Sequence, residues 1–419
     1  MPQTLTQKIL QTYADQEVKG PGQIVRCKVS LVLANDITAP LAIKSFKEMG
    51  AKKVFDKDNV ALVMDHYTPQ KDVASANQVK ECRDFAREVG LTHYYEGGNC
   101  GVEHALLPEL GLVGPGDLVV GADSHTCTYG GLGAFATGMG STDIAAAMAL
   151  GETWFKVPPS IHVIFNGVMP EWLRAKDLIL ALIGKIGVDG ALYSALEFDG
   201  SAIEKLDVEG RMTMANMAIE AGGKAGLFAS DGKTREWCAA HARPDARLIA
   251  ADPGANYQEG HIFDVSAMEP LVACPHLPSN VKPVSALPSL PIDQVIIGSC
   301  TNGRISDMRD AALVLKGRKI ARDVRCIILP ATPGIWKQSM KEGLFDIFTD
   351  AGCIIGPPTC GPCLGGHMGI LGDGERAVAT TNRNFRGRMG SLASEVYLSS
   401  PVVAAASATA GIIISPAQL

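Results

Sequence analysis

The stretch Pro358-Thr359-Cys360-Gly361-Pro362-Cys363-Leu364-Gly365-Gly366 holds a Cys-x-x-Cys pair within a turn rich in Gly and Pro. This pattern has two very different uses. It can be a Cys-Gly-Pro-Cys dithiol that exchanges disulfides, or it can supply two thiolates to a metal or iron–sulfur site. A third interpretation, small buried hydrophobic side chains, is ordinary for Cys238 or Cys326 but fits a Gly/Pro turn poorly. The rest of the chain has to decide among these uses.

Apolar strands and helices alternate on both sides of this turn. The C-terminal part predicts strands at 294–297, 326–329 and 353–355, and helices at 308–315, 336–342 and 402–410. The N-terminal part predicts strands at 24–34, 60–64, 117–121 and 161–165, and helices at 40–49, 74–89 and 143–150. Such alternation is typical of α/β folds, in which polar residues just past the carboxyl ends of strands are the expected site positions.

Proline-rich passages divide the chain. Val157-Pro158-Pro159 indicates one boundary, and the passage 275–291, which holds five prolines, indicates another. We therefore expect α/β domains at 1–157, 158–274 and 292–419, with 275–291 as a linker. A chain of 419 residues is long enough for each domain to bury its own core.

Composition excludes several classes of function. Hydrophobic residues make up 47% of the chain and charged residues 20%, and the net charge of −6 is spread without a basic face, so we expect no nucleic acid and no membrane partner. The 11 cysteines are scattered and odd in number, which argues against a secreted disulfide framework. The N-terminus lacks a signal-peptide core, and no stretch is long enough to span a bilayer, so we expect a cytoplasmic protein.

A third cysteine can join the Cys-x-x-Cys pair. Cys300 follows the strand 294–297, and in a parallel sheet its turn would lie at the same edge as the turn of Cys360 and Cys363. Zinc would favour a fourth ligand, for which His367 is the nearest candidate, whereas a 4Fe-4S cluster on three cysteines leaves one iron open as a Lewis acid. The disulfide-exchange hypothesis has the matching motif, but Thr359 stands where thioredoxins have Trp, and no thioredoxin-sized βαβ unit begins just upstream.

Several side chains could supply acid–base chemistry or bind carboxylates. Asp65-His66 and Asp123-Ser124-His125 each place a carboxylate beside a histidine after an apolar strand, and His104 and Glu220 are further candidates. Taken alone, each pair is more often structural than functional. The arginines of 383–388 are either a solvated loop or a clamp for carboxylates, and beside an open iron they would favour a small di- or tricarboxylate.

Four segments together resemble the aconitase superfamily, in the family's order and over nearly the whole chain. They are Gly121–Thr126, Gly298–Arg304, Thr359–Cys363 and Asn382–Arg388. The resemblance implies that Cys300, Cys360 and Cys363 hold one 4Fe-4S cluster with one iron not ligated by protein. It favours the shorter, archaeal-type, two-subunit branch, which interconverts 2-isopropylmalate and 3-isopropylmalate in leucine biosynthesis.

The resemblance also implies roles for individual residues. Asp65 and His66 match the pair that protonates the leaving hydroxyl, His104 and Glu220 match a second active-site histidine and its acid, and Asp123 and His125 match a further pair. The substrate-binding and cluster-supporting positions are matched by Ser124, Asn382, Arg383 and Arg388. The sequence departs from aconitase at Asn35, where aconitase has a glutamine that contacts substrate.

The family's fourth, swivelling domain has no counterpart before Leu419. That domain carries the serine base that removes the carbon-bound proton and further substrate arginines. We therefore expect three α/β domains around the cluster, with a separate small subunit that supplies the swivelling domain in a heterodimer or heterotetramer. Homoaconitate, citraconate and dimethylmalate are alternative substrates. A thiol–disulfide oxidoreductase using Cys360 and Cys363, or a non-catalytic zinc or iron protein, are alternatives of other classes.

Overall fold

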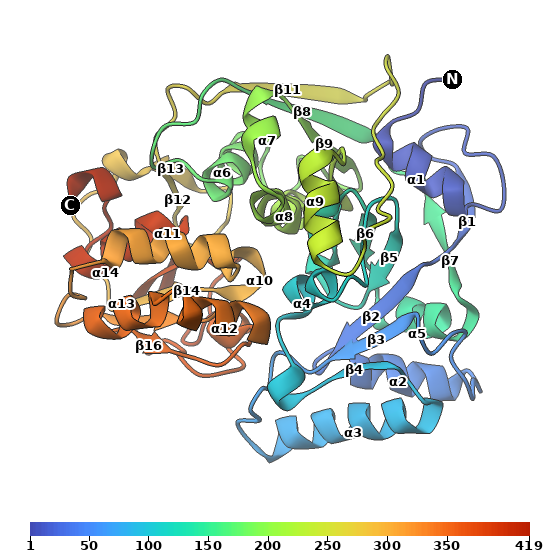
Figure 1. Cartoon of the computed structure of the whole chain (residues 1–419), viewed down its shortest axis with the longest axis horizontal. Helices are drawn as coiled ribbons and strands as arrows, with labels where there is room; N and C mark the ends of the chain where they lie inside the picture. The colour runs from blue at the N-terminus through green and yellow to red at the C-terminus, as the bar shows by residue number, and fades with distance from the viewer.

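The computed structural model describes residues 1–419 and shows four β-sheets covered by helices (Figure 1). A five-stranded and a two-stranded sheet form the N-terminal part, a four-stranded sheet the middle part, and a seven-stranded sheet the C-terminal part. No helix combines the length and the apolar character needed to cross a membrane.

The N-terminal part is built on a fully parallel sheet in the order β4-β3-β2-β5-β6. Its strands are β2 (Leu31–Asn35), β3 (Val60–Val63), β4 (His93–Tyr95), β5 (Leu118–Gly121) and β6 (Phe135–Gly138). Its helices are α1 (Leu5–Tyr13), α2 (Ala39–Glu48), α3 (Val73–Val89), α4 (Glu103–Glu109) and α5 (Ser141–Leu150), with 3-10 turns η1 (Gly97–Asn99) and η2 (Ser124–Leu132). β2 and β3 are completely buried, as strands covered on both faces must be.

The prediction of a single strand at 24–34 was wrong, because two strands of different sheets, β1 (Ile24–Lys28) and β2, occupy this range. β1 alternates exposed and buried residues and pairs antiparallel with β7 (Glu152–Lys156), whereas β2 is buried throughout and lies in the parallel sheet. The chain changes sheets at Ser30, whose N–H and hydroxyl both donate to the carbonyl oxygen of Leu118. The change from alternating to continuous burial marks this break, but a continuous run of β-favouring residues obscures it.

The glycine-rich passage after β5 serves close packing. A Cβ at Gly130 would overlap the carbonyl oxygen of Gly226, and one at Gly131 would press on the backbone of Met212. The N-terminal and middle parts therefore meet backbone to backbone along η2. β6, which the sequence analysis did not predict, lies within this passage.

The middle part contains a parallel sheet in the order β10-β9-β8-β11. Its strands are β8 (Ser160–Asn166), β9 (Ala195–Asp199), β10 (Ala225–Phe228) and β11 (Glu259–Asp264). Its helices are α6 (Ala175–Ile186), α7 (Ser201–Lys205), α8 (Val208–Asn216) and α9 (Gly232–Ala240), with the 3-10 turn η3 (Met217–Ala221).

The C-terminal part has the sheet order β13-β12-β18-β17-β14-β15-β16. Its strands are β12 (Leu271–Ala273), β13 (Val281–Pro283), β14 (Gln294–Ile297), β15 (Arg325–Ile328), β16 (Ile354–Ile355), β17 (Arg376–Ala379) and β18 (Glu395–Leu398). Its helices are α10 (Ser299–Asn302), α11 (Ile305–Leu315), α12 (Pro333–Lys341), α13 (Leu344–Ala351) and α14 (Pro401–Ala410), with 3-10 turns η4 (Val284–Ala286), η5 (Gly361–Leu364) and η6 (Pro416–Gln418). Strands β14 to β18 pair in parallel, and β12 and β13 are antiparallel additions.

This sheet reaches further back along the chain than expected. β12 falls within the range predicted for the second domain, and β13 lies within the passage 275–291 predicted to be a linker. That passage is therefore partly sheet, because Val281–Pro283 pairs with Leu271–Ala273. The division into three domains stays a prediction.

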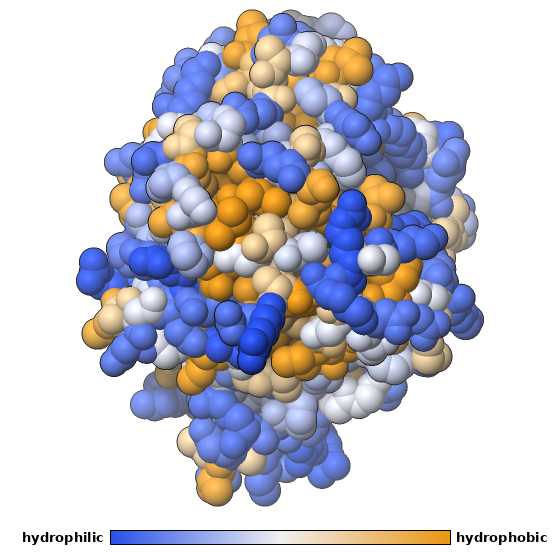
Figure 2. Space-filling view, turned by 90° about the vertical axis from the view of Figure 1, so that its left-hand side faces the viewer, coloured by the Kyte–Doolittle hydropathy of each residue, from blue (hydrophilic) through white to orange (hydrophobic).

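Figure 2 shows the C-terminal side of the molecule, where apolar side chains gather within a polar border.

Candidate active site

Three cysteines converge at the carboxyl edge of the seven-stranded sheet. Cys300 lies in α10 directly after β14, and Cys360 and Cys363 lie at and within η5 after β16. β14, β15 and β16 run parallel, so both turns leave the same edge. The chain turns sharply before Cys300, where Gly298 has a φ of 153° and Ser299 one of 74°, a left-handed value that is uncommon outside glycine.

The three thiols share one buried cavity. Their residues are 4%, 6% and 2% exposed for Cys300, Cys360 and Cys363, and none forms a disulfide. A hydrogen bond from Cys360, aided by the guanidinium of Arg388, lowers the pKa of Cys363 to about 5, whereas burial raises the pKa of Cys300 to about 12. Asn382 joins the set, because its Nδ2 donates to Cys300 Sγ at 3.3 Å.

This donor set fits an iron–sulfur cluster better than the alternatives. Three converging thiols, none of them in a disulfide, match three cysteine ligands. The expected fourth zinc ligand, His367, does not line the cavity, and its Nε2 lies 3.0 Å from the carbonyl oxygen of Thr68. A disulfide-exchanging pair needs an accessible attacking thiol, and both cysteines of the pair are buried.

Two carboxylates and a histidine form one cluster of ionisable side chains, made of Asp36, Asp65 and His66. His66 Nδ1 lies 2.7 Å from Asp65 Oδ1 and 3.3 Å from Asp36 Oδ1. Asp65 Oδ2 also accepts the N–H of Glu103 at 2.8 Å, and Asp36 accepts the N–H groups of His66 and Tyr67. Burial opposes the charged imidazole, but the two carboxylates outweigh it and raise the pKa of His66 well above 6.5. The arrangement favours an imidazolium beside the thiols.

A second relay runs through Asp123. Its Oδ1 lies 2.9 Å from His104 Nε2 and 3.4 Å from His125 Nδ1, and His125 Nε2 lies 2.9 Å from Glu220 Oε1. Burial lowers the pKa of His104. The pKa of His125 is raised, because its bonds to Asp123 and Glu220 outweigh burial. Burial opposes the charged carboxylate of Glu220, but its contacts with His125 and Arg383 outweigh burial and lower the pKa of Glu220. The two histidines therefore favour opposite protonation states.

Two arginines face the cavity. Arg383 Nε donates to both oxygens of Glu220, at 2.8 and 3.1 Å, and its Nη2 donates to Ser124 Oγ at 3.0 Å. Arg388 lines the same cavity, and its buried Nε has no hydrogen-bond partner. An unpartnered guanidinium N–H in a cavity is suited to a carboxylate. Arg386 is exposed and lines neither this cavity nor the pocket outside it.

The cavity opens into a wider pocket of about 570 Å³. Both spaces are lined by His66, Asp123, Leu364, Arg383 and Arg388. The outer rim carries Trp154, Tyr193 and Lys224, with Trp154 55% exposed. A small molecule would therefore reach the cysteines past the histidine, carboxylate and arginine side chains.

The sequence analysis missed some of the buried residues at this site. Glu103 lies 3.5 Å from His104 Nε2, accepts Asn35 Nδ2 at 2.8 Å, and has a strongly raised pKa because it is buried near Asp65 and Asp123. Asp36 was not among the predicted site residues either. Its position just past β2 was the available signal, since the polar ends of parallel strands gather at one edge. Asn35 itself is fully buried and is held by Glu103 and by the N–H groups of residues 37 and 38.

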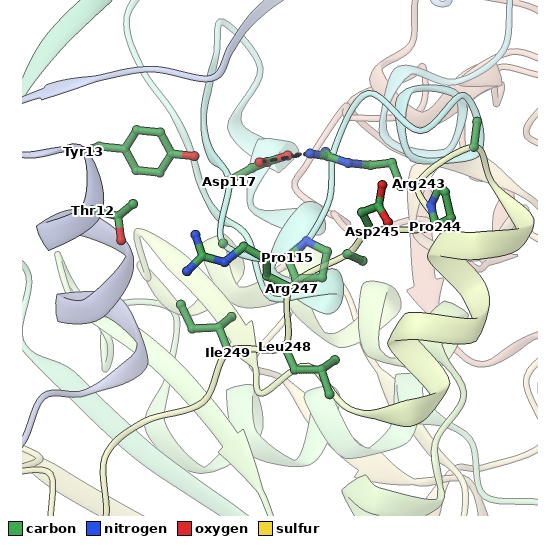
Figure 3. Close-up of a pocket in the computed structure, with 13 residues that line it drawn as sticks. Thr12, Tyr13, Pro115, Asp117, Arg243, Pro244, Asp245, Arg247, Leu248 and Ile249 are labelled. Atoms are coloured by element: carbon green, nitrogen blue, oxygen red, sulfur yellow. Dashed lines mark hydrogen bonds and ion pairs between the residues drawn. The ribbon is translucent and has the colours of Figure 1, made fainter.

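A separate pocket of about 440 Å³ lies between α1 and the segment 242–249 (Figure 3). Arg243 there pairs with Asp117, and the side chains of Tyr13 and Arg247 also line the space. It shares no lining residue with the cysteine cavity. None of the predicted site residues lines this separate pocket. They lie in or next to the cysteine cavity and the wider pocket outside it.

Comparisons with known proteins agree on one family. The model of the aconitase family (aconitate hydratase) matches residues 7–291 and 285–411. The chain is 75% identical to the 3-isopropylmalate dehydratase large subunit of Nitratidesulfovibrio vulgaris strain Miyazaki F, and 58% identical to that of Acetivibrio thermocellus, with 100% of each chain covered. The crystal structure of Thermococcus kodakaraensis aconitase X in its holo-form matches with a TM-score of 0.52 at 15% identity, over 93% of both chains, which supports the fold alone. The chain belongs to the aconitase family and has its α/β fold.

Proposed function

We propose that this chain is the large subunit of a 3-isopropylmalate dehydratase. It would act as a hydro-lyase that interconverts 2-isopropylmalate and 3-isopropylmalate in leucine biosynthesis. Relatives that are 70–75% identical over the full chain carry this name. The observation that carries the chemistry is the shared cavity of three thiols, an imidazole held by two carboxylates, and two arginines.

Membership of the aconitase family implies an iron–sulfur cluster. We propose that it is one 4Fe-4S cluster per chain, held by Cys300, Cys360 and Cys363, with one iron not ligated by protein. When bound, such a cluster supplies a Lewis acid for the substrate's hydroxyl and one carboxylate. Asn382 supports the site by donating a hydrogen bond to Cys300 Sγ.

The acid for the leaving oxygen is His66. Asp65 and Asp36 both engage its Nδ1, which orients the ring and keeps it protonated. The other nitrogen, Nε2, then donates its proton as the carbon–oxygen bond breaks, and the product is water. The reverse reaction returns that proton to the imidazole.

The arginines and the second relay hold the substrate. Arg388 offers its unpartnered Nε–H to a carboxylate of the substrate. Glu220 holds Arg383 through its Nε, which leaves other N–H groups of that guanidinium available to the substrate. Ser124 is held by Arg383 and adds a hydroxyl group at the same wall. His125 contacts both Glu220 and Asp123, and these contacts hold the charged groups in fixed positions around one small diacid.

A small subunit completes the enzyme. The relatives are named large subunits, and we propose that a partner chain with a swivelling domain covers the outer pocket and supplies the base for the carbon-bound proton. Whether the assembly is a heterodimer or a heterotetramer stays a prediction, as does the cytoplasmic location.

The test is anaerobic co-expression with candidate small subunits. The purified, reconstituted complex is assayed on 3-isopropylmalate, homoaconitate and citraconate, with the isolated large chain as the control. We expect the highest kcat/KM on 3-isopropylmalate, and no turnover without the small subunit. A higher kcat/KM on another diacid would show that 3-isopropylmalate is not the preferred substrate. Robust turnover by the large chain alone would overturn the two-subunit mechanism.

A further inference from the structure

Lys176 is a fully buried lysine that the proposed mechanism does not use. It is the second residue of α6, in the middle part of the molecule, and its exposed fraction is 0%. Its Nζ donates to the carbonyl oxygens of Thr381 and Thr380, at 2.6 and 2.9 Å, and lies 3.4 Å from Asn302 Oδ1. The ammonium therefore points from the middle part into the C-terminal part.

These acceptors belong to the two segments that frame Cys300. Asn302 lies two residues after Cys300 in α10, and Thr381 directly precedes Asn382. Asn382 in turn donates to Cys300 Sγ at 3.3 Å, and its Oδ1 lies 3.6 Å from Cys363 Sγ. The ammonium of Lys176 thus contacts both the turn after β14 and the turn after β17. The first turn carries Cys300, and the second carries Asn382, which contacts Cys300 and Cys363.

Burial lowers the pKa of Lys176 to about 7, because no strong counter-ion balances the charge of its ammonium group. Its three acceptors are neutral, and burying an ammonium is costly unless an anion balances it. Asp307 and Asp177 lie near, but burial raises the pKa of each to about 7, and backbone N–H groups or Asn302 already occupy their oxygens. Cys300 and Cys363 are the other acidic groups close enough to act on the ammonium. Loaded cysteine ligands would supply the missing negative charge.

We infer that Lys176 is a positioning residue for the iron–sulfur cluster. It fixes the Cys300 turn and the Asn382 segment, and it holds a positive charge behind the thiolates. That charge makes the bound cluster easier to reduce, and the hydrogen bonds slow the loss of iron. This inference rests on the proposed function in one respect, which is that the three cysteines hold a cluster.

The test uses Lys176→Met, which removes the charge and all hydrogen bonds, and Lys176→Gln, which removes the charge but keeps amide N–H donors on a side chain one bond shorter. Lys185→Met, at an exposed lysine of the same helix, is the matched control. Each full-length chain is reconstituted anaerobically with iron and sulfide. Iron and sulfide content, the reduction potential from an EPR-monitored titration, and the rate of bleaching in air-saturated buffer are then measured, with circular dichroism of the apo chain to report folding.

We expect a more negative potential in both Lys176 variants. Iron loss should be about tenfold faster in Lys176→Met, the lower end of the effect of residues that support metal ligands, and less affected in Lys176→Gln. Lys185→Met should match the wild type. Wild-type potential and bleaching rate in either folded variant would overturn the inference. Failure of both apo variants to fold would overturn it too, because Lys176 would then serve the fold rather than the cluster. If the wild-type chain itself takes up no cluster, the proposed function fails, and the inference fails with it.

Discussion

The Glu220→Gln substitution tests the relay that links His104 and His125 to Arg383, the arginine proposed to bind the substrate. Glu220 is 4% exposed and accepts hydrogen bonds from His125 Nε2 at 2.9 Å and from Arg383 Nε at 2.8 Å. Glutamine has nearly the same shape and keeps one carbonyl oxygen, but it carries no charge. The substitution therefore removes the counter-charge for both cations and leaves their positions otherwise unchanged.

The size of the effect follows from those two contacts. A hydrogen bond to a charged group contributes about 1.5–3 kcal/mol and a neutral one about 0.5–1.5 kcal/mol, so each contact loses about 1–1.5 kcal/mol. Together the two contacts lose about 2–3 kcal/mol. If Arg383 holds the substrate in the transition state, kcat/KM falls roughly 30- to 160-fold.

The assay is the hydration and dehydration of isopropylmalate by the anaerobically reconstituted two-subunit complex. Glu236→Gln, at an exposed position of α9, is the control for loss of one carboxylate. Iron content must equal that of the wild type, so that the loss is not a loss of cluster. A Glu220→Gln enzyme whose kcat/KM stays within about threefold of the wild type, a change of about 0.65 kcal/mol, would refute the role given to this relay.

Three further outcomes are expected. Cys300→Ser should abolish cluster uptake, measured as iron and sulfide per chain, whereas Cys238→Ser should not; a dithiol oxidoreductase would tolerate both changes. Gly130→Ala should destabilise the chain by about 1–3 kcal/mol in thermal unfolding because its Cβ has no room, whereas Gly232→Ala, which meets open space, should be close to neutral. The raised pKa of His66 stabilises the fold fully below pH 6.5, and this contribution is lost as pH rises through the raised value. His66→Gln should therefore lose less stability than the wild type when the apo chain is melted at rising pH, and equal slopes would contradict the ion pair.

The sequence predicted three of the seven strands of the C-terminal sheet, β14, β15 and β16, because these are short apolar runs bounded by turns, and it missed β12, β13, β17 and β18. Parallel pairing of β14, β15 and β16 then brings Cys300 and the Cys360–Cys363 pair to one edge. The same logic failed at residues 24–34, where two strands of different sheets follow one another without a turn signal. It also failed at 275–291, where prolines do not prevent β13 from pairing at the sheet's edge.

By itself, the sequence determined the α/β alternation and the acid–base candidates, because periodicity and motif spacing are local properties. It also predicted the three cysteines as cluster ligands, through the family resemblance of their motifs. Only the tertiary structure decided which distant groups meet. Glu103 is buried against Asn35, and Lys176 crosses from α6 to the turns around Cys300. Neither contact has a local signature, since each joins residues far apart in the chain whose ionisation is set by burial and by neighbours from other elements. The roles of the cysteines could therefore be predicted from the sequence, whereas the charges that surround them depend on how the parts pack.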